Sequence, residues 1–164
     1  MRDYQVLFVC TGNSCRSPMA AGFLHHHLPE SQRDRLRILS CGTAAVDGGP
    51  ASVHAIAVMR EKGIDIGDHR SRHLSRDLVE ASDIIFVMEE SHRRELLERF
   101  PAYRDNVFLL RTFGRQQRTK KIEIADPHGG ELSEYRICRD DIENEVRRIL
   151  PPLLRLLNSP QDAS

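Results

Sequence analysis

Short apolar segments alternate with amphipathic ones along this chain. The apolar runs predict strands at residues 4–9, 36–41, 84–88 and 107–110. Apolar positions at helical spacing predict helices at residues 18–28, 51–62, 75–81, 90–99 and 132–150. Strands that alternate with helices form parallel sheets that are covered on both faces. We therefore predict an α/β fold, a single three-layer domain with a four-stranded parallel sheet and helices on both faces.

The last predicted helix ends at a proline pair. Pro151-Pro152 lacks two backbone N–H groups and is expected to kink or break the helix. Leucines beyond the pair continue the apolar surface as far as Leu157. A chain of 164 residues suits one domain with a sizeable core. We expect that domain at residues 1–158 and a disordered tail at residues 159–164.

The segment at residues 10–20 follows the first predicted strand and holds the most specific chemistry. Gly12 and Asn13 tolerate positive φ angles, so they predict a tight turn. Ser17 is suited to cap the next helix, and Pro18 to its first turn, where a missing N–H costs little. A strand, a tight loop and a helix N-terminus together predict a phosphate-binding loop lined by backbone N–H groups.

Cys10 and Arg16 in this loop fit a nucleophilic attack on phosphorus. A helix N-terminus, inward amides and an arginine favour a thiolate, which predicts a lowered pKa for Cys10. The Ser17 hydroxyl can bond the sulfur, and the planar fork of Arg16 matches two phosphate oxygens. The alternative is a buried structural cysteine beside a surface arginine. The Gly, Asn, Ser and Pro residues at these offsets disfavour it.

The loop resembles the active-site signature of the low-molecular-weight protein tyrosine phosphatases, in which Cys, five residues and Arg precede Ser or Thr near the N-terminus. The matching residues are Cys10-Thr11-Gly12-Asn13-Ser14-Cys15-Arg16-Ser17-Pro18-Met19-Ala20, and the resemblance extends to about residue 157. It implies a hydrolase that forms a phosphocysteine on Cys10 and needs no metal or organic cofactor. The phosphate-binding residues that it implies are Thr11, Gly12, Asn13, Ser14, Cys15, Arg16 and Ser17.

A second chemical element is the turn at Asp126-Pro127, shortly before the last helix. A carboxyl group on such a loop can protonate a leaving group and then activate water. On residue chemistry alone, an aspartate in a turn is more often structural than catalytic. The general acid of the family is the Asp of an Asp-Pro pair at this place. The resemblance therefore implies that Asp126 is the acid.

The resemblance also implies a network that supports the loop. Asn13 matches an asparagine that takes a left-handed conformation, and Ser17 belongs to the same loop. His69 matches a histidine of this network, although a surface histidine is the alternative. The remaining serine of the network is not assigned, since Cys41 stands where some members have serine and Ser40 lies beside it.

The four cysteines are Cys10, Cys15, Cys41 and Cys138, and they do not form the two close pairs that a structural zinc site needs. No metal site is expected. The resemblance implies that Cys10 and Cys15 are a redox pair, in which a disulfide spares the nucleophile from overoxidation. The alternative for Cys15 is a small buried side chain.

The substrate is ambiguous between phosphotyrosine and phosphoarginine. Tyrosine-directed members usually carry a bulky aliphatic residue at the position of Ser14 and aromatic residues after the Asp-Pro pair. This chain has Ser14, His128, Gly129 and Gly130 there, closer to the protein arginine phosphatase branch. That branch usually has threonine in place of Ser14, and often an aromatic residue in place of His128. The family as a whole favours tyrosine, whereas these residues favour arginine.

Two other classes are disfavoured. Thioredoxin-coupled arsenate reductases share this loop but need two further cysteines as a relay, and the segment from Ser82 to Ser91 contains none. A non-catalytic phosphate-binding module does not explain why both a nucleophile and a plausible acid are present.

Charge and composition narrow the partners. Lys+Arg and Asp+Glu are both 24, so no global charge favours nucleic acid or an anionic membrane. No apolar run is long enough to span a bilayer, and no signal-peptide pattern is present. We expect a cytoplasmic monomer or weak dimer that acts on phosphorylated proteins or peptides. A basic stretch at residues 111–121 is interpreted as a solvated loop, and His25–His27 as exposed decoration of the first helix.

Overall fold

The computed structural model describes residues 3–159 and contains one four-stranded parallel sheet. The strand order is β2-β1-β3-β4. The strands are β1 (Tyr4–Cys10), β2 (Leu36–Gly42), β3 (Ile84–Val87) and β4 (Val107–Leu109). In the register of the central pair, Val6 lies opposite Ile84 and Val9 opposite Val87. The α/β prediction and the four strands are confirmed, with ends that shift by a residue or two.

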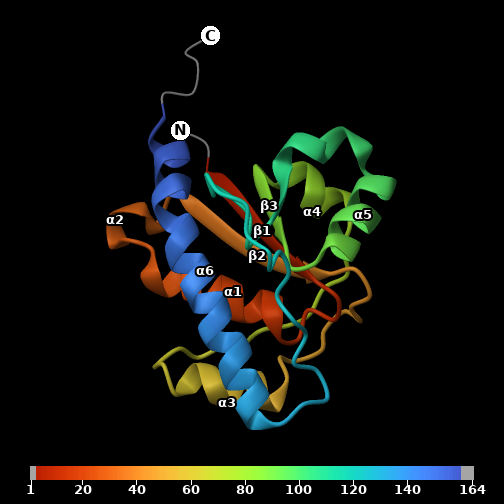
Figure 1. Cartoon of the computed structure of the whole chain (residues 1–164), viewed down its shortest axis with the longest axis vertical. Coiled ribbons are helices and arrows are strands. Elements are labelled where there is room, and N and C mark those ends of the chain that lie inside the picture. Colours follow the sequence, from red (N-terminus) through yellow and green to blue (C-terminus); the bar gives the residue numbers. More distant parts are fainter. Residues whose placement is uncertain (1–2, 160–164) are drawn as a thin grey trace.

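The helices form layers on both sides of this sheet (Figure 1). Apolar side chains of β1 alternate between two cores, because successive residues of a strand face opposite sides. Val6 and Phe8 belong to the larger core, and Leu7 and Val9 to the smaller one. The larger core is covered by α1 (Arg16–His27), α3 (Val53–Arg60) and α6 (Leu132–Asn158). The smaller core is covered by α4 (Arg76–Ala81) and α5 (Glu90–Arg99).

Two short helical segments were not predicted. They are α2 (Glu30–Arg33), which has no buried residue, and the 3-10 helix η1 (Pro101–Asn106). Neither has enough apolar positions to show a helical period. Both lie in connections between elements, so they leave the predicted topology unchanged.

The start of α1 differs from the prediction. The helix begins at Arg16, its N-cap residue is Cys15, and no side chain caps it. Ser17 lies inside the first turn, where its hydroxyl contacts the Cys10 sulfur instead of a backbone N–H. The prediction of Ser17 as the helix cap was therefore wrong, whereas Pro18 does lie in the first turn.

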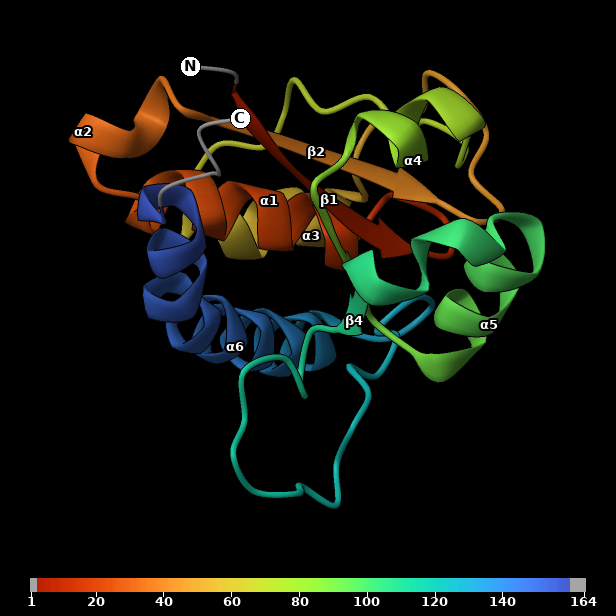
Figure 2. The same ribbon diagram turned by 90° about the horizontal axis from the view of Figure 1, so that it is seen from above.

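The proline pair does not break α6. The helix runs through Pro151 and Pro152 to Asn158, and Figure 2 shows its last turns, in dark blue, in a different direction from the first ones. Leu153 and Leu157 beyond the pair are buried in the larger core, which holds these turns in place. The predicted tail lies outside the described residues except for Ser159.

The connection between β4 and α6 leaves the body of the domain as a long loop (Figure 2). Its base is held by ion pairs, because the buried Arg111 contacts Asp141 and Glu145 of α6. Arg115 also pairs with Glu145, at 2.9 Å. The basic stretch is thus a solvated loop only beyond its anchored base. His25 and His26 at the end of α1 are exposed, as predicted, whereas His27 is half-buried and pairs with Glu143.

Among residues 3–159, no helix combines the length and the apolar content that a membrane span requires.

Candidate active site

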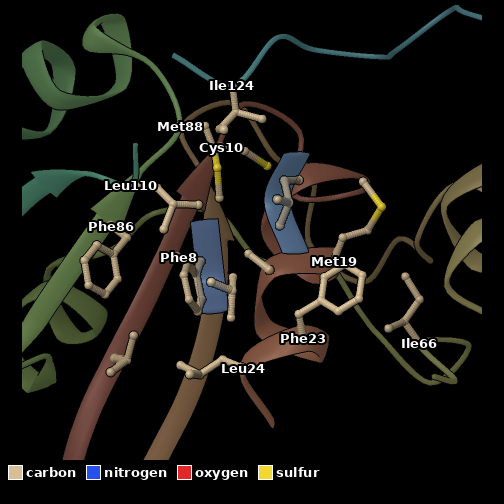
Figure 3. Close-up of a cluster of buried hydrophobic side chains, with 14 of the residues drawn as sticks. Phe8, Cys10, Met19, Phe23, Leu24, Ile66, Phe86, Met88, Leu110 and Ile124 are labelled. Atoms are coloured by element: carbon tan, nitrogen blue, oxygen red, sulfur yellow. The ribbon is translucent and has the colours of Figure 1, made fainter. Parts of the chain in front are cut away.

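The phosphate-binding loop joins the end of β1 to the start of α1, at the carboxyl edge of the sheet. Cys10 closes the larger core at this edge, with Met88 and Ile124 beside it in Figure 3. The segment that follows β2 packs directly on the loop, where Thr43 N donates to Cys10 O at 2.9 Å. Gly42 permits this packing, since a Cβ there would lie 2.3 Å from the Thr11 carbonyl oxygen.

Asn13 is the centre of the loop's hydrogen bonds. Within residues 3–159 it is the one non-glycine residue with a positive φ, at 54°, and it is fully buried. Its side-chain amide donates to Ser17 Oγ at 2.8 Å and to Ser40 Oγ at 2.9 Å. Its side-chain oxygen accepts from the Arg72 N–H, and its backbone oxygen accepts from His69 Nε2 at 2.7 Å.

This network brings together the supporting residues that the sequence predicted. His69 bonds the loop itself, and burial lowers its pKa below the usual value, although the Asn13 carbonyl opposes that shift. Ser40, left unassigned from the sequence, is the remaining serine of the network. Cys41 is fully buried in the smaller core.

The Cys10 sulfur lies 2.9 Å from Ser17 Oγ and accepts from the Asn13 N–H at 3.2 Å. Burial raises the pKa of the Cys10 thiol, while the bonds from Ser17, the charge of Arg16 and the bond from Asn13 oppose the increase. The predicted lowering of this pKa was wrong for the structure as it stands. Cys10 is 2% exposed, and Glu89 neutralises part of the Arg16 charge at 2.5 Å.

The Arg16 guanidinium is buried and fixed from several directions. Its Nη1 donates to Glu89 Oε1 and, at 2.8 Å, to the Ile124 carbonyl oxygen. Its Nη2 lies 3.4 Å from Thr11 Oγ1 and 3.4 Å from Asp126 Oδ2. One guanidinium therefore links the phosphate-binding loop, the start of α5 and the segment at residues 124–130 that carries Asp126, here called the acid loop.

Asp126 lines the same cavity as Cys10 but lies on a much more open segment. Its side chain is 42% exposed, and its Oδ1 accepts from the His128 N–H at 3.0 Å. Gly129 follows with a φ of 80°. The structure thus brings the predicted acid to the same cavity as the predicted nucleophile.

That cavity has a volume of about 170 Å³ and contains most of the residues predicted from the sequence. It is lined by Cys10, Thr11, Gly12, Ser14, Cys15, Arg16, Asp126 and His128. Asn13, Ser17 and His69 are not among the lining residues and act behind it. Gly129 and Gly130 lie beside it in the acid loop, and no phenyl ring is among the lining residues.

The sequence did not reveal three side chains that hold the site. Glu89 pairs with Arg16, and His92 contacts Thr11 Oγ1 at 2.8 Å. Tyr135 places its hydroxyl 3.4 Å from the Cys15 sulfur. Glu89 follows β3, which pairs with β1, and this position was an available signal, since neighbouring parallel strands end at one edge.

Cys15 faces polar groups from other segments. Its sulfur lies 3.3 Å from Ser52 Oγ, in addition to the Tyr135 contact. All four cysteines are free thiols, so the predicted pairing of Cys10 with Cys15 under oxidation stays a prediction. Cys138 is buried in the larger core.

Comparisons with known proteins show the family to which this chain belongs. The family model for the low molecular weight phosphotyrosine protein phosphatase matches residues 5–159. A protein-arginine-phosphatase of Geobacillus stearothermophilus is 39% identical over 150 residues, which cover 92% of this chain and 96% of that protein. A probable low molecular weight protein-tyrosine-phosphatase, EpsP of Ralstonia nicotianae, is 35% identical and covers 92% and 97%.

Solved structures support the same family assignment. The YwlE arginine phosphatase from Geobacillus stearothermophilus superposes with a TM-score of 0.84 at 36% identity, over 97% of this chain and 99% of that one. Sequence, fold and cavity therefore agree, and the chain belongs to the low molecular weight phosphotyrosine protein phosphatase family, as a hydrolase of its cysteine-dependent type.

Proposed function

We propose that this protein is a protein-arginine phosphatase. Cys10 attacks phosphorus as the thiolate, and the bond from phosphorus to the guanidinium nitrogen breaks while Asp126 protonates that nitrogen. Water then attacks the phosphocysteine, Asp126 accepts its proton, and the sulfur leaves as the thiolate with release of phosphate. Arg16 and the loop N–H groups hold the phosphoryl oxygens throughout.

The observation that carries this proposal is the set of residues that line the cavity. Ser14 lines it and offers a hydroxyl that can accept from a guanidinium N–H. The acid loop continues into Gly129 and Gly130, which leave room for a long polar side chain. A phenyl ring needs apolar flanking groups to bury its faces, and the described lining residues offer none that is aromatic except His128.

Phosphotyrosine is the second candidate. His128 lines the cavity, and an imidazole can stack on a phenyl ring. Three relatives named as tyrosine phosphatases or probable tyrosine phosphatases, EpsP, AmsI and Wzb, are 33–37% identical to this chain. The same chemistry then applies with a phenoxide as the leaving group, which Asp126 protonates.

We further propose that the enzyme acts on phosphorylated proteins or peptides as a monomer or weak dimer, folded as one domain over residues 1–158. Its nucleophile is a free thiol and must stay reduced, which fits the cytoplasm. Zero formal net charge fits a partner that is neither nucleic acid nor an anionic membrane.

Kinetics on matched peptides test the substrate. One peptide sequence is prepared with phosphoarginine and with phosphotyrosine, and kcat/KM is measured for both with Cys10→Ser as the blank. We expect a preference for phosphoarginine of at least about tenfold, because the hydroxyl of Ser14 pairs with the guanidinium. In Ser14→Ile this preference decreases or reverses. A wild-type preference for phosphotyrosine would overturn the arginine assignment and support the role of His128.

A further inference from the structure

The Thr11 side chain lies at the rim of the cavity, directly after the nucleophile. It is exposed and lines the cavity together with Cys10 and Asp126. Its Oγ1 lies 2.8 Å from His92 Nε2 and 3.4 Å from Arg16 Nη2. A threonine hydroxyl has one hydrogen to donate and two lone pairs that accept. Its partners therefore decide where that hydrogen can go.

His92 is a donor to Thr11. Its other ring nitrogen, Nδ1, accepts from the Glu89 backbone N–H at 3.1 Å. A backbone N–H can only donate, so Nδ1 carries no hydrogen, and the neutral ring must carry its hydrogen on Nε2. His92 is 2% exposed, which fixes the ring in this orientation at the start of α5.

Arg16 is the second donor, since a guanidinium has no acceptor. Both lone pairs of Thr11 Oγ1 are thus occupied by N–H groups. The hydroxyl hydrogen is left for an acceptor in the cavity that Thr11 lines. We infer that the Thr11 hydroxyl donates a hydrogen bond to a phosphoryl oxygen of the substrate, and that His92 is the positioning residue that holds it in this orientation.

This donor has a chemical use. Negative charge on the phosphoryl oxygens is redistributed during transfer, and a fixed donor stabilises it without reorganisation. Two residues at the start of α5 then orient side chains that line the cavity. Glu89 orients Arg16, and His92 orients Thr11. The inference builds on the proposed phosphatase chemistry but does not depend on which amino acid carries the phosphate.

The first test compares Thr11→Val with Thr11→Ser. Valine keeps the shape and removes the hydroxyl, whereas serine keeps the hydroxyl. We measure kcat/KM for p-nitrophenyl phosphate and the Kd for inorganic phosphate by calorimetry. Thr11→Val is expected to lower kcat/KM by about 10- to 100-fold and to weaken phosphate binding. Thr11→Ser is expected to recover most of both losses. Should Thr11→Val not fold, Thr11→Ala replaces it.

The second test asks whether His92 acts through Thr11. In His92→Asn the side-chain oxygen still accepts from the Glu89 N–H, but the shorter amide does not reach Thr11. We expect kcat/KM to fall by about 5- to 10-fold in the wild-type background and by less than about twofold in the Thr11→Val background. A purely structural role of His92 would give the same loss in both backgrounds and would contradict the inference.

These outcomes are separate from the choice of substrate. Thr11→Val activity and phosphate affinity within about twofold of wild type would overturn the Thr11 donor. A wild-type enzyme that hydrolyses p-nitrophenyl phosphate but not phosphoarginine would overturn the proposed substrate and leave the Thr11 test intact. If wild type hydrolyses neither, the proposed function fails, and the phosphate Kd values of wild type and Thr11→Val still decide the inference.

Discussion

The phosphate-binding loop and the acid loop face the same cavity but are built differently. In the first, Asn13, Arg16 and Ser17 are at most 2% exposed and are held by several hydrogen bonds each. In the second, Asp126 is 42% exposed, and its contacts are the His128 N–H and the edge of Arg16. The first loop joins two elements of the cores, and the second belongs to the long connection between β4 and α6.

The difference follows from what each loop does in the proposed reaction. The phosphoryl group is the same in every substrate, so its site gains from rigid donors that need no reorganisation. The leaving group differs between substrates and must enter and leave, so the acid is carried by an exposed segment. Substitutions in the two loops should therefore separate effects on folding from effects on chemistry.

The largest expected effect removes the nucleophile. Cys10→Ser is expected to lower kcat for p-nitrophenyl phosphate by at least about 10⁴-fold, because a hydroxyl in this setting is a far poorer nucleophile than a thiolate. Serine still fits beside Ser17, so the protein folds and binds inorganic phosphate. Calorimetry checks the binding. Turnover close to that of wild type would contradict the assignment of Cys10.

The next effect separates chemistry from stability. Asp126→Asn removes the proton donor and is expected to lower kcat for a phosphoarginine peptide by about 10²- to 10³-fold. Because the side chain is exposed, the free energy of unfolding should change by less than about 0.5 kcal/mol. Urea unfolding measures the second quantity. A large loss of stability with little loss of kcat would show that Asp126 serves the fold and not the chemistry, which would contradict the comparison of the two loops.

For Asn13 we expect the opposite of the Asp126 result, namely a clear loss of stability. Asn13→Ala removes the hydrogen bonds to Ser17, Ser40 and the Arg72 N–H and places alanine at a φ of 54°, so we expect a loss of about 2–3 kcal/mol in stability. Asn13→Gly is the matched control, since glycine removes the bonds but accepts the backbone angle. It should be less destabilised than alanine. Equal stability of wild type and Asn13→Ala would show that the network does not hold the loop.

The last prediction concerns how protein stability depends on pH through His92, which contacts the phosphate-binding loop at Thr11. Burial, aided by the charge of Arg16, lowers the pKa of His92 from 6.5 to about 4. Between these values the unfolded chain binds a proton that the folded chain does not. This contribution of His92 to stability therefore decreases as pH falls through that window, by up to about 1.4 kcal/mol per pH unit. Urea unfolding at several pH values should show a shallower slope for His92→Asn. Parallel slopes would contradict this.

Much of the fold was predictable, because the spacing of apolar residues along the chain indicates which side chains are buried. The apolar runs of β1 and β3 face both cores, and the apolar face of α6 covers the larger one. The path of α6 through Pro151 was not predictable, because it depends on Leu153 and Leu157 packing in the larger core. The rule that proline kinks or breaks a helix considers only the local backbone and leaves out such packing.

Only those residues of the site that stand in a short sequence motif were predictable. Cys10, Arg16 and Asp126 stand in motifs, and the structure places all three at one cavity. Glu89 and His92 stand in no motif, and only the pairing of β3 with β1 brings them to the loop. Burial of Cys10 explains the wrong direction for its pKa, because the sequence showed the charge of Arg16 but not how completely the thiol is removed from water.

The most direct test of the account is detection of the phosphocysteine. Asp126→Asn is mixed with p-nitrophenyl phosphate, whose leaving group needs little protonation, and the reaction is quenched in acid and analysed by peptide mass spectrometry. Loss of Asp126 slows the attack of water, so the account predicts one phosphoryl group on the peptide that contains Cys10, absent from Cys10→Ala, which has no nucleophile at this position. Release of phosphate with no adduct on that peptide, or an adduct on another residue, would contradict it.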